Sequence, residues 1–306
     1  MSEYHEPVMG HEVLELLAPS DGGLYLDGTA GGGGHTRMIL EACETCRVIA
    51  VDRDPEALVE ARGALADVRA RVRFVSARFD EALIDPEIQD RGLDGALLDL
   101  GVSSHQLDAD DRGFTFRRGA RLDMRMGGEG PDATAFLAEA DEDELTHVFR
   151  DFGEEPKARR LAREVAKRRA TEPLSTSDDL VAAMAVSFGR SPSAKEKARI
   201  FQAVRIAVNE ELDALEAGLP AIRDVMKAGG VMVVIAYHSL EDRAVKNAFR
   251  EWSRACVCPP ELPVCTCRGE PLGETLTRKV LRPTAEEVER NPRARSARLR
   301  AWRRAA

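Results

Sequence analysis

The sequence lacks a long hydrophobic run, a secretory leader and an excess of basic residues. Its longest continuous apolar segment, residues 231–237, is far shorter than the roughly 20 residues of a membrane-spanning helix, so we expect no membrane partner. The N-terminus has neither the basic start nor the apolar stretch of a signal peptide, which favours a cytoplasmic location. The formal net charge of −9, taken alone, argues against a nucleic-acid partner, because phosphates attract Lys and Arg.

Cysteine is present without a secretory context. Six Cys among 306 residues indicate a reducing compartment, where thiols or a metal site are more common than disulfides. Cys43 and Cys46 form a C-x-x-C at a predicted helix end, not at a redox helix N-terminus, and we interpret them as structural. Cys256-Val-Cys258 and Cys265-Thr-Cys267 could bind zinc, with reduced thiols in a loop as the alternative. Because C-x-C is less diagnostic than C-x₂-C, we assign no metal site.

The first hundred residues alternate short apolar segments with segments of helical spacing. A composition of 43% hydrophobic and 32% charged residues is typical of a globular protein with a core. The alternation implies βαβ units, and therefore a parallel sheet covered by helices on both faces. The predicted strands are residues 24–27, 48–52, 72–76 and 95–100, with predicted helices at 36–44 and 55–65.

This alternation is interrupted in the middle of the chain, where only helical patterns occur. The helical segments are residues 141–150, 156–170 and 176–186, followed by a helix at 199–219, a strand at 231–237, a helix at 238–252 and strand-like segments at 276–282 and 297–303. We therefore predict an α/β fold with a doubly wound, Rossmann-like sheet domain. Its two parts are residues 1–107 and 199–306, the second with a basic C-terminal tail, and an all-helical domain of residues 108–198 is inserted between them.

A glycine-rich loop, DGTAGGGGHT at residues 27–36, joins the first predicted strand to the next helix. Glycine permits a tight turn and lets a ligand approach the helix N-terminus. Gly31 and Gly33 match the first two glycines of the dinucleotide pattern G-x-G-x-x-G, but Thr36 stands in the place of the third, so this pattern is excluded. No G-K-[ST] follows, which excludes a Walker-type phosphate loop. The ligand class that remains for such a loop is S-adenosylmethionine, which has a carboxylate and a ribose but no phosphate. A turn without a ligand is the alternative, opposed by an ordering cost of about 0.5–1 kcal/mol per glycine.

Acidic residues end the second and fourth predicted strands. Asp52 stands where a carboxylate can bind both hydroxyls of a ribose, whereas Asp54 precedes a proline and better fits a helix cap. Asp99 should face the crevice beyond the strand ends, in contact with the cofactor. There it could accept a proton from an aromatic amino group, or instead cap a turn through the amides of Ser103 or Ser104.

A series of short motifs follows the same order along the chain as in a known family. They are His5-Glu-Pro-Val8, Asp27-Gly-Thr with Gly33-Gly34-His35, Asp52-Arg-Asp-Pro55, Leu98-Asp-Leu-Gly-Val-Ser-Ser104, Arg112-Gly-Phe114, Leu122-Asp-Met-Arg-Met126, Phe201-Gln-Ala-Val-Arg-Ile206, His238-Ser-Leu-Glu-Asp-Arg243 and Asn291-Pro-Arg-Ala-Arg-Ser296. Together they resemble the MraW/RsmH methyltransferases, bacterial class I enzymes that methylate N4 of a cytidine in the decoding centre of 16S ribosomal RNA. Departures are Met9-Gly10, where the family usually has Leu, and Thr36, where Ser is common.

The resemblance implies a cofactor, a set of site residues and an RNA partner. The cofactor is S-adenosyl-L-methionine, with Phe79 against its adenine and Asp99 and His238 as the catalytic candidates. The implied cofactor-binding residues are Gly33, Gly34, His35, Asp52, Phe79, Asp99 and Gln106. The implied partner is 16S ribosomal RNA within the small ribosomal subunit. The sequence leaves the oligomeric state, monomer or homodimer, open.

The mechanism has one gap, because many amino-group methyltransferases follow the acid of strand four with Pro-Pro and an aromatic residue that stacks on the base. This chain has Leu-Gly-Val at residues 100–102 instead. Phe114, Phe116 and Tyr237 are candidates for stacking, and each is equally readable as ordinary core. His238 could contact the base, with a helix cap as the favoured alternative.

The net charge of −9 is unevenly distributed. Residues 157–169 hold seven basic residues and one acid, and residues 278–304 hold ten basic residues and three acids. Residues 132–155 have nine acids and one Arg, and could face solvent or the basic helix. The basic segments can contact phosphates, although such runs are often solvated faces. We expect an RNA with accessible unpaired bases; methylation of a small molecule or protein, and RNA binding without catalysis, are the alternatives.

Overall fold

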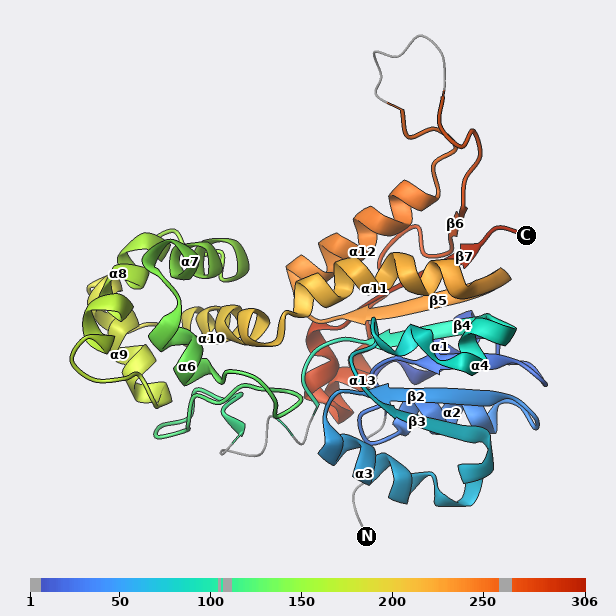
Figure 1. Ribbon diagram of the computed structural model, residues 1–306, viewed down its shortest axis with the longest axis horizontal. Helices are drawn as coiled ribbons and strands as arrows, with labels where there is room; N and C mark the ends of the chain where they lie inside the picture. Colours follow the sequence, from blue (N-terminus) through green and yellow to red (C-terminus); the bar gives the residue numbers. More distant parts are fainter. Residues whose placement is uncertain (1–6, 104–105, 107–111, 259–265) are drawn as a thin grey trace. The chain divides into compact units, whose positions relative to one another are not determined.

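The computed structural model describes residues 7–103, 106, 112–258 and 266–306. The chain divides into two compact units, one of Met1–Gly101 with Asp213–Ala306 and one of Val102–Leu212 (Figure 1). We refer to them as the sheet unit and the helical unit. The helical unit extends beyond the predicted bounds of 108–198 at both ends. At its C-terminal end it includes the whole helix that precedes residue 210.

The sheet unit contains a seven-stranded sheet of order β3-β2-β1-β4-β5-β7-β6. The five strands predicted between residues 24 and 237 are parallel, and the last two are antiparallel. The α/β fold class is therefore confirmed. The strands are β1 (Leu24–Asp27), β2 (Arg47–Asp52), β3 (Val72–Ser76), β4 (Leu93–Asp99), β5 (Met226–Ala236), β6 (Gly273–Thr275) and β7 (Arg298–Arg304).

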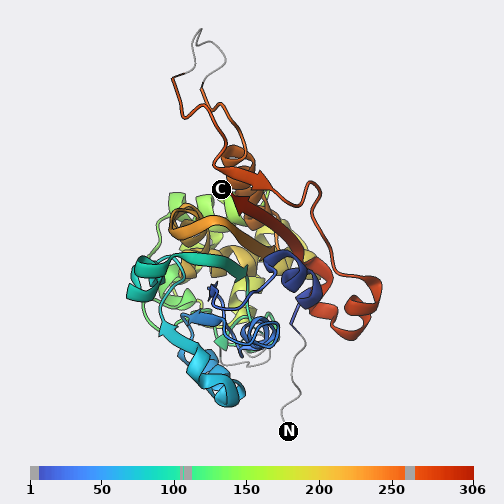
Figure 2. The same ribbon diagram turned by 90° about the vertical axis from the view of Figure 1, so that its right-hand side faces the viewer.

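Helices cover both faces of this sheet (Figures 1 and 2). The described helices of the unit are α1 (Gly10–Leu17), α2 (Gly34–Glu41), α3 (Pro55–Ala64), α4 (Pro86–Arg91), α11 (Glu211–Val225), α12 (Ser239–Trp252) and α13 (Ala285–Arg290), with short 3₁₀ turns η1 (Ala66–Arg71), η2 (Ala82–Ile84) and η5 (Pro292–Ser296). In β1, Leu24 and Leu26 enter the core beneath α4, α11 and α12, whereas Tyr25 enters the core beneath α1 and α2. Alternate residues of one strand thus serve two cores, as a doubly wound sheet requires.

The helical unit has its own apolar core. Its described helices are α6 (Ala133–Glu139), α7 (Glu142–His147), the π-turn η4 (Val148–Phe152), α8 (Ala158–Arg169), α9 (Ser177–Phe188) and α10 (Ala194–Asn209). In α8, the buried residues Ala158, Leu161, Ala162 and Val165 recur at helical spacing, so its charged residues face outward. Phe149 of η4 is fully buried in the same core.

Two predicted elements differ from the structure. The predicted helix 199–219 is two helices, because Ser193 caps α10 and Glu210 ends it in the left-handed conformation (φ 50°). The predicted strand 276–282 is wrong, since β6 ends before it at Thr275 and residues 276–282 contain a single bridge, between Leu281 and Leu299. The end of the basic tail is β7, which lies inside the sheet.

Cys43 and Cys46 are joined by a disulfide, so our expectation of thiols is wrong for this pair. The predictions for His5, Ser104 and Cys265 lie outside the described residues. No helix in the described part of the chain is long and apolar enough to cross a membrane.

Candidate functional site

The glycine loop lies across the carboxyl ends of the central strands. The backbone N–H of Gly28 donates to the carbonyl of Leu97 on β4 (2.9 Å), and that of Ala30 donates to Val51 on β2 (2.8 Å). At the foot of the loop, Asp27 accepts from the hydroxyl of Thr36 at 2.6 Å, both residues being fully buried. These bonds fix the loop at the edge where open α/β sheets bind ligands.

Several glycines of the loop have no room for a side chain. A Cβ at Gly28 would lie 2.5 Å from Leu98 Cδ2, and one at Gly34 would lie 2.8 Å from Pro7 Cγ. Gly33 has φ +87°, and its Cβ would lie 3.0 Å from Leu65 Cδ1. At Gly31 (φ +51°) a Cβ would meet no atom within 4 Å. The loop is therefore packed against the protein on one side and open at Gly31.

We expect Gly33→Ala to lower the free energy of unfolding by about 1–2 kcal/mol, because Ala disfavours positive φ and would crowd Leu65. Gly32→Ala is the matched control, since Gly32 lacks a positive φ and faces only the mobile end of Glu60. Urea unfolding of both variants measures the difference. Equal stability of the two variants would contradict the constraint that we assign to Gly33.

Asp52, at the end of β2, is positioned by two backbone N–H groups. Its Oδ2 accepts from Gly31 and its Oδ1 from Asp54, each at 2.8 Å. Burial raises the pKa of Asp52 to about 6, against the opposing effect of these hydrogen bonds. Each oxygen keeps a lone pair for a further donor. Asp54 itself caps α3 by accepting from Glu56 N, which confirms the capping interpretation.

Asp99 ends β4 beside the same loop. Its N–H donates to Thr29 Oγ1 (2.6 Å), and its Oδ1 accepts from the hydroxyl of Tyr237 (2.8 Å). Its side chain retains 22% exposure. Burial raises the pKa of Asp99 to about 6, while His35 and the Tyr237 hydrogen bond act in the opposite direction. Asp99 is thus a partly exposed carboxylate with an increased affinity for a proton.

His35 connects the N-terminal segment to Asp99. Its Nε2 lies 3.0 Å from the carbonyl of Val8, and its Nδ1 lies 3.7 Å from Asp99 Oδ2. A carbonyl can only accept, so Nε2 carries a proton and Nδ1 is the nitrogen that faces Asp99. The glycine loop therefore lies together with Asp52, His35 and Asp99 at the edge formed by the carboxyl ends of the parallel strands.

The MraW methylase family matches residues 2–305 of this chain. The chain belongs to the MraW methylase family. It is 52% identical over 303 residues to the ribosomal RNA small subunit methyltransferase H of Gemmatimonas aurantiaca, covering 98% of this chain and 95% of that one. Proteins of the same name from Heliobacterium modesticaldum (47% identical; 97% of each chain) and Anaeromyxobacter sp. (48%; 97% and 96%) are similar as well. The resemblance inferred from the motifs is confirmed, and the chain is a methylase.

The remaining predicted site residues of this methylase lie in different places. Phe79, past β3, lies beside Gly28 of the loop and against α11, where a Cβ on Gly218 would come within 2.4 Å of its ring. Gln106 is a buried residue of the helical unit, where its side chain accepts from Ser103 N at 3.0 Å. Because the amide of Ser103 donates to Gln106, it does not support the alternative in which Asp99 caps a turn through this amide. The assignment of Phe79 and Gln106 to the cofactor stays a prediction.

His238 is the N-cap of α12. Its side chain accepts from Glu241 N at 3.4 Å, and its Nε2 lies 3.0 Å from Glu241 Oε1. The other carboxylate oxygen of Glu241 accepts from Tyr237 N at 2.9 Å. These contacts account for His238 as the capping group that we considered, and its catalytic role stays a prediction.

The three aromatic candidates for base stacking have separate environments. Phe114 is packed against the helical core, and Phe116 makes an edge contact with Phe201 at a centroid distance of 5.9 Å. Tyr237 is the one among them that contacts a predicted site residue in the described structure. The sequence offered one signal for this contact, since Tyr237 is the last residue of the predicted strand 231–237, which we placed in the sheet with Asp99.

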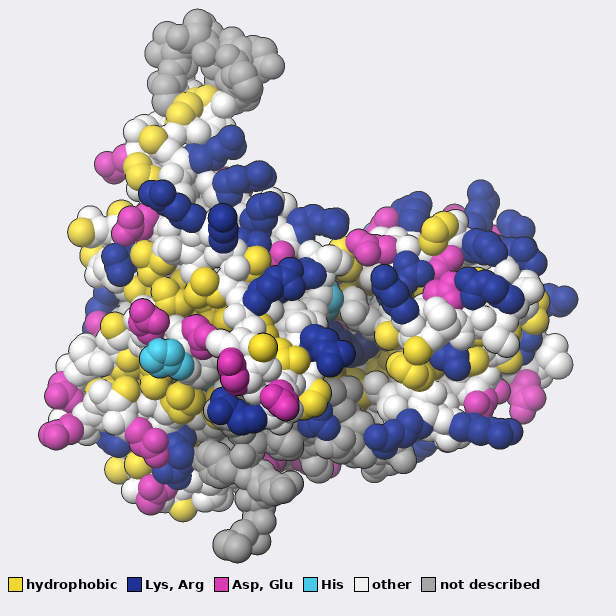
Figure 3. Space-filling view, turned by 180° about the vertical axis from the view of Figure 1, so that it is seen from behind, with side chains coloured by type: hydrophobic (Ala, Val, Ile, Leu, Met, Phe, Trp, Pro, Cys, Tyr) yellow, Lys and Arg dark blue, Asp and Glu magenta, His cyan; other side chains and the backbone are white. Residues whose placement is uncertain are grey.

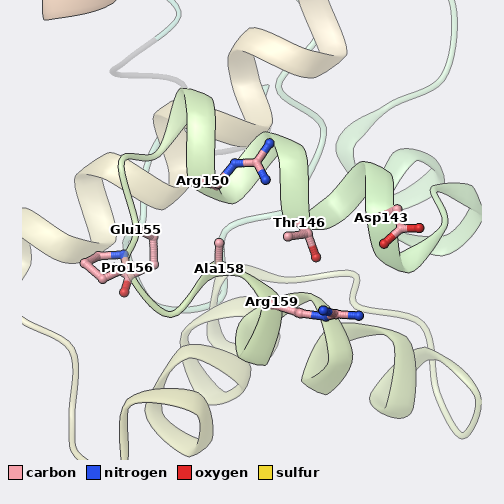
Figure 4. A pocket seen from close by; sticks show the side chains of 7 residues that line it. All are labelled: Asp143, Thr146, Arg150, Glu155, Pro156, Ala158 and Arg159. Atoms are coloured by element: carbon pink, nitrogen blue, oxygen red, sulfur yellow. The ribbon is translucent and has the colours of Figure 1, made fainter.

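A cavity of about 370 Å³ opens in the helical unit (Figure 4). It is lined by Asp143, Thr146, Arg150, Glu155, Pro156, Ala158 and Arg159. The guanidinium of Arg150 donates a hydrogen bond to the carboxylate of the neighbouring Asp151 at 2.7 Å. None of our predicted site residues lines this cavity, and its mixed charges favour no one ligand.

In the sheet unit, Lys and Arg side chains gather at the base of the long segment between α12 and β6 (Figure 3). In the sheet unit, Arg278, Lys279 and Arg282 are exposed. In the helical unit, exposed Arg163 of α8 lies 3.5 Å from Glu142 of α7, so part of the acidic stretch faces the basic helix. The surface charge is thus locally basic despite the net charge of −9.

Proposed function

We propose that this methylase transfers a methyl group from S-adenosyl-L-methionine to N4 of a cytidine in the decoding centre of 16S ribosomal RNA. The observation that carries the proposal is the carboxylate of Asp99, held by Tyr237 beside the glycine loop. The names of the relatives, ribosomal RNA small subunit methyltransferase H, support ribosomal RNA as the substrate. We further propose that the chain acts in the cytoplasm on RNA of the small subunit.

The residues around the loop fit S-adenosyl-L-methionine. The two oxygens of Asp52 are already oriented by Gly31 and Asp54, so their remaining lone pairs can accept from both ribose hydroxyls. The N-terminus of α2, at Gly34, offers N–H groups for the carboxylate. Phe79, beside Gly28, offers a ring for the adenine. Nothing in this set requires a phosphate.

The bound cofactor supplies an activated methyl group on its sulfonium, so this chain must align the acceptor and remove one proton. The amino group of cytosine is a poor nucleophile because its lone pair is delocalised into the ring. Asp99 accepts a hydrogen bond from this nitrogen and takes its proton as the methyl transfers. Tyr237 holds Oδ1 of Asp99, which leaves Oδ2 for the substrate.

The substrate is RNA with an accessible base, because a stacked and paired amino group lies out of reach. The exposed residues Arg278, Lys279 and Arg282 contact phosphates and position the strand without reading its sequence. Arg163 and its neighbours on α8 serve the same purpose in the helical unit.

We expect the triple variant R278A/K279A/R282A to bind RNA more weakly and with less dependence on salt. Each lost phosphate contact reduces the slope of log K against log salt by about 0.7 for single-stranded RNA, so three lost contacts reduce it by about 2. Filter binding between 50 and 200 mM salt measures this slope. Unchanged affinity for S-adenosyl-L-methionine is the control, and an unchanged slope would contradict the assignment of these residues to the RNA surface.

Transfer of a radiolabelled methyl group tests the proposed class of substrate. Purified protein and labelled S-adenosyl-L-methionine are incubated with small ribosomal subunits, naked 16S RNA, or ribosomal proteins. We expect label in RNA. Label in protein or in small molecules alone would establish another methyl acceptor, and RNA binding without any transfer would establish a non-catalytic factor.

A further inference from the structure

The segment between α12 and β6 leaves the sheet unit as an arm. Residues 253–258 and 266–272 run side by side away from the sheet in both views (Figures 1 and 2). In these two segments, the sulfur atoms of Cys256, Cys258 and Cys267 all lie within 4.8 Å of one another. Three thiols from two antiparallel segments are therefore gathered at one point.

The spacing of the sulfur atoms fits a shared metal ion. Cys256 Sγ and Cys267 Sγ are 3.8 Å apart, whereas a disulfide requires about 2.05 Å. Zinc binds thiolates tetrahedrally at about 2.3 Å, which places two sulfur ligands of one ion about 3.8 Å apart. The observed distance thus matches the edge of a zinc–thiolate tetrahedron.

The surroundings of the thiols also suit a bound ion. The N–H of Val257 points at Cys267 Sγ (3.4 Å), a contact that orients a sulfur ligand and stabilises its negative charge. The guanidinium of Arg268 donates to the carbonyls of Glu251 (2.7 Å) and Arg254 (3.0 Å), which holds the two segments together next to the thiols. Cys256 is exposed, so an ion can enter from solvent.

We propose that Cys256, Cys258 and Cys267 bind one Zn²⁺ and that the ion joins the two described segments of the arm. Each thiol releases its proton to solvent and ligates the ion as a thiolate, and a fourth donor completes the tetrahedron. Soft thiolate ligands select zinc over Mg²⁺ or Ca²⁺, and no electron is transferred. The site is structural, and it is independent of the methyl transfer proposed above.

Metal analysis of the full-length protein tests the site. The protein is purified with a reductant and without chelators, and its zinc is measured by plasma mass spectrometry. We expect about one zinc per chain in the wild type and at least a fivefold loss in Cys256→Ser and Cys267→Ser. Val257→Ser, which lies between two ligands and supplies none, is the matched control and should retain the zinc. Zinc-free wild-type protein, or full zinc in both Cys variants, would overturn the proposal.

Two further measurements separate metal binding from misfolding and from disulfide formation. Co²⁺ added to metal-free wild-type protein should give the visible absorption of a tetrahedral thiolate site, and Cys256→Ser should not. Trypsin should cleave at Arg254 and Arg268 several-fold faster after chelation, while affinity for S-adenosyl-L-methionine stays unchanged. Absence of the cobalt spectrum would contradict a zinc site. A disulfide between Cys256 and Cys267 that persists in protein purified with the reductant would contradict it as well.

Discussion

Asp99→Asn is expected to lower kcat for methyl transfer by about 10²–10⁴-fold at saturating cofactor, because the amide cannot take the proton from the amino nitrogen. Single-turnover methylation of RNA measures the loss. Calorimetry with S-adenosyl-L-methionine provides the control, since Asp99 is also predicted to contact the cofactor. Near-normal turnover of the variant would exclude an essential proton-accepting role.

The pH dependence of kcat gives the same prediction a second test. Burial raises the pKa of Asp99 to about 6, and only the ionised carboxylate can accept a proton, so the wild-type rate should rise through pH 6 and then level off. Tyr237 lowers the pKa of Asp99 through its hydrogen bond, so Tyr237→Phe should move this rise to higher pH. A profile with the same midpoint in both proteins would contradict the role of Tyr237 as a positioning residue.

Asp52→Ala is expected to weaken the binding of S-adenosyl-L-methionine by about 10²–10⁴-fold. The variant loses an acceptor for two ribose hydroxyls, and hydrogen bonds to a charged group contribute about 1.5–3 kcal/mol each. It also releases the N–H of Gly31, which Asp52 holds at 2.8 Å. Calorimetry on the free chain measures the affinity.

Asp54→Asn is the matched control for Asp52. Asp54 caps α3, and Asn is as good a cap, so stability and cofactor affinity should both change little. In the wild type, affinity should fall as the pH drops below about 6, because burial raises the pKa of Asp52 to about 6 and protonation removes its charge. Equal affinities of Asp52→Ala and wild type would refute the ribose role.

The sequence was sufficient for the parts of this molecule that depend on local pattern. The alternation of strands and helices predicts the parallel sheet, and the acidic strand ends predict that Asp52 and Asp99 lie at one edge beside the glycine loop. Glycine at residue 33 is explained by its positive φ, a constraint that a single chain segment imposes on itself.

Other features depend on register between distant segments, which local pattern does not contain. The hydrogen bond from Tyr237 to Asp99 joins residues 138 positions apart and requires β5 to pair with β4 so that Asp99 faces Ile235. The division of the predicted helix 199–219 depends on one residue, Glu210, in a left-handed conformation that its residue type does not favour. The thiol cluster likewise requires the two segments of the arm to run side by side.

The most direct test of the central claim is the chemical identity of the methylated nucleoside. Small ribosomal subunits lacking the modification are incubated with the protein and labelled S-adenosyl-L-methionine, and the 16S RNA is digested to nucleosides for mass spectrometry. We predict label in N4-methylcytidine, formed about 10²–10⁴-fold more slowly with Asp99→Asn. Label in 5-methylcytidine, in a ribose methyl group or in another nucleoside would contradict it.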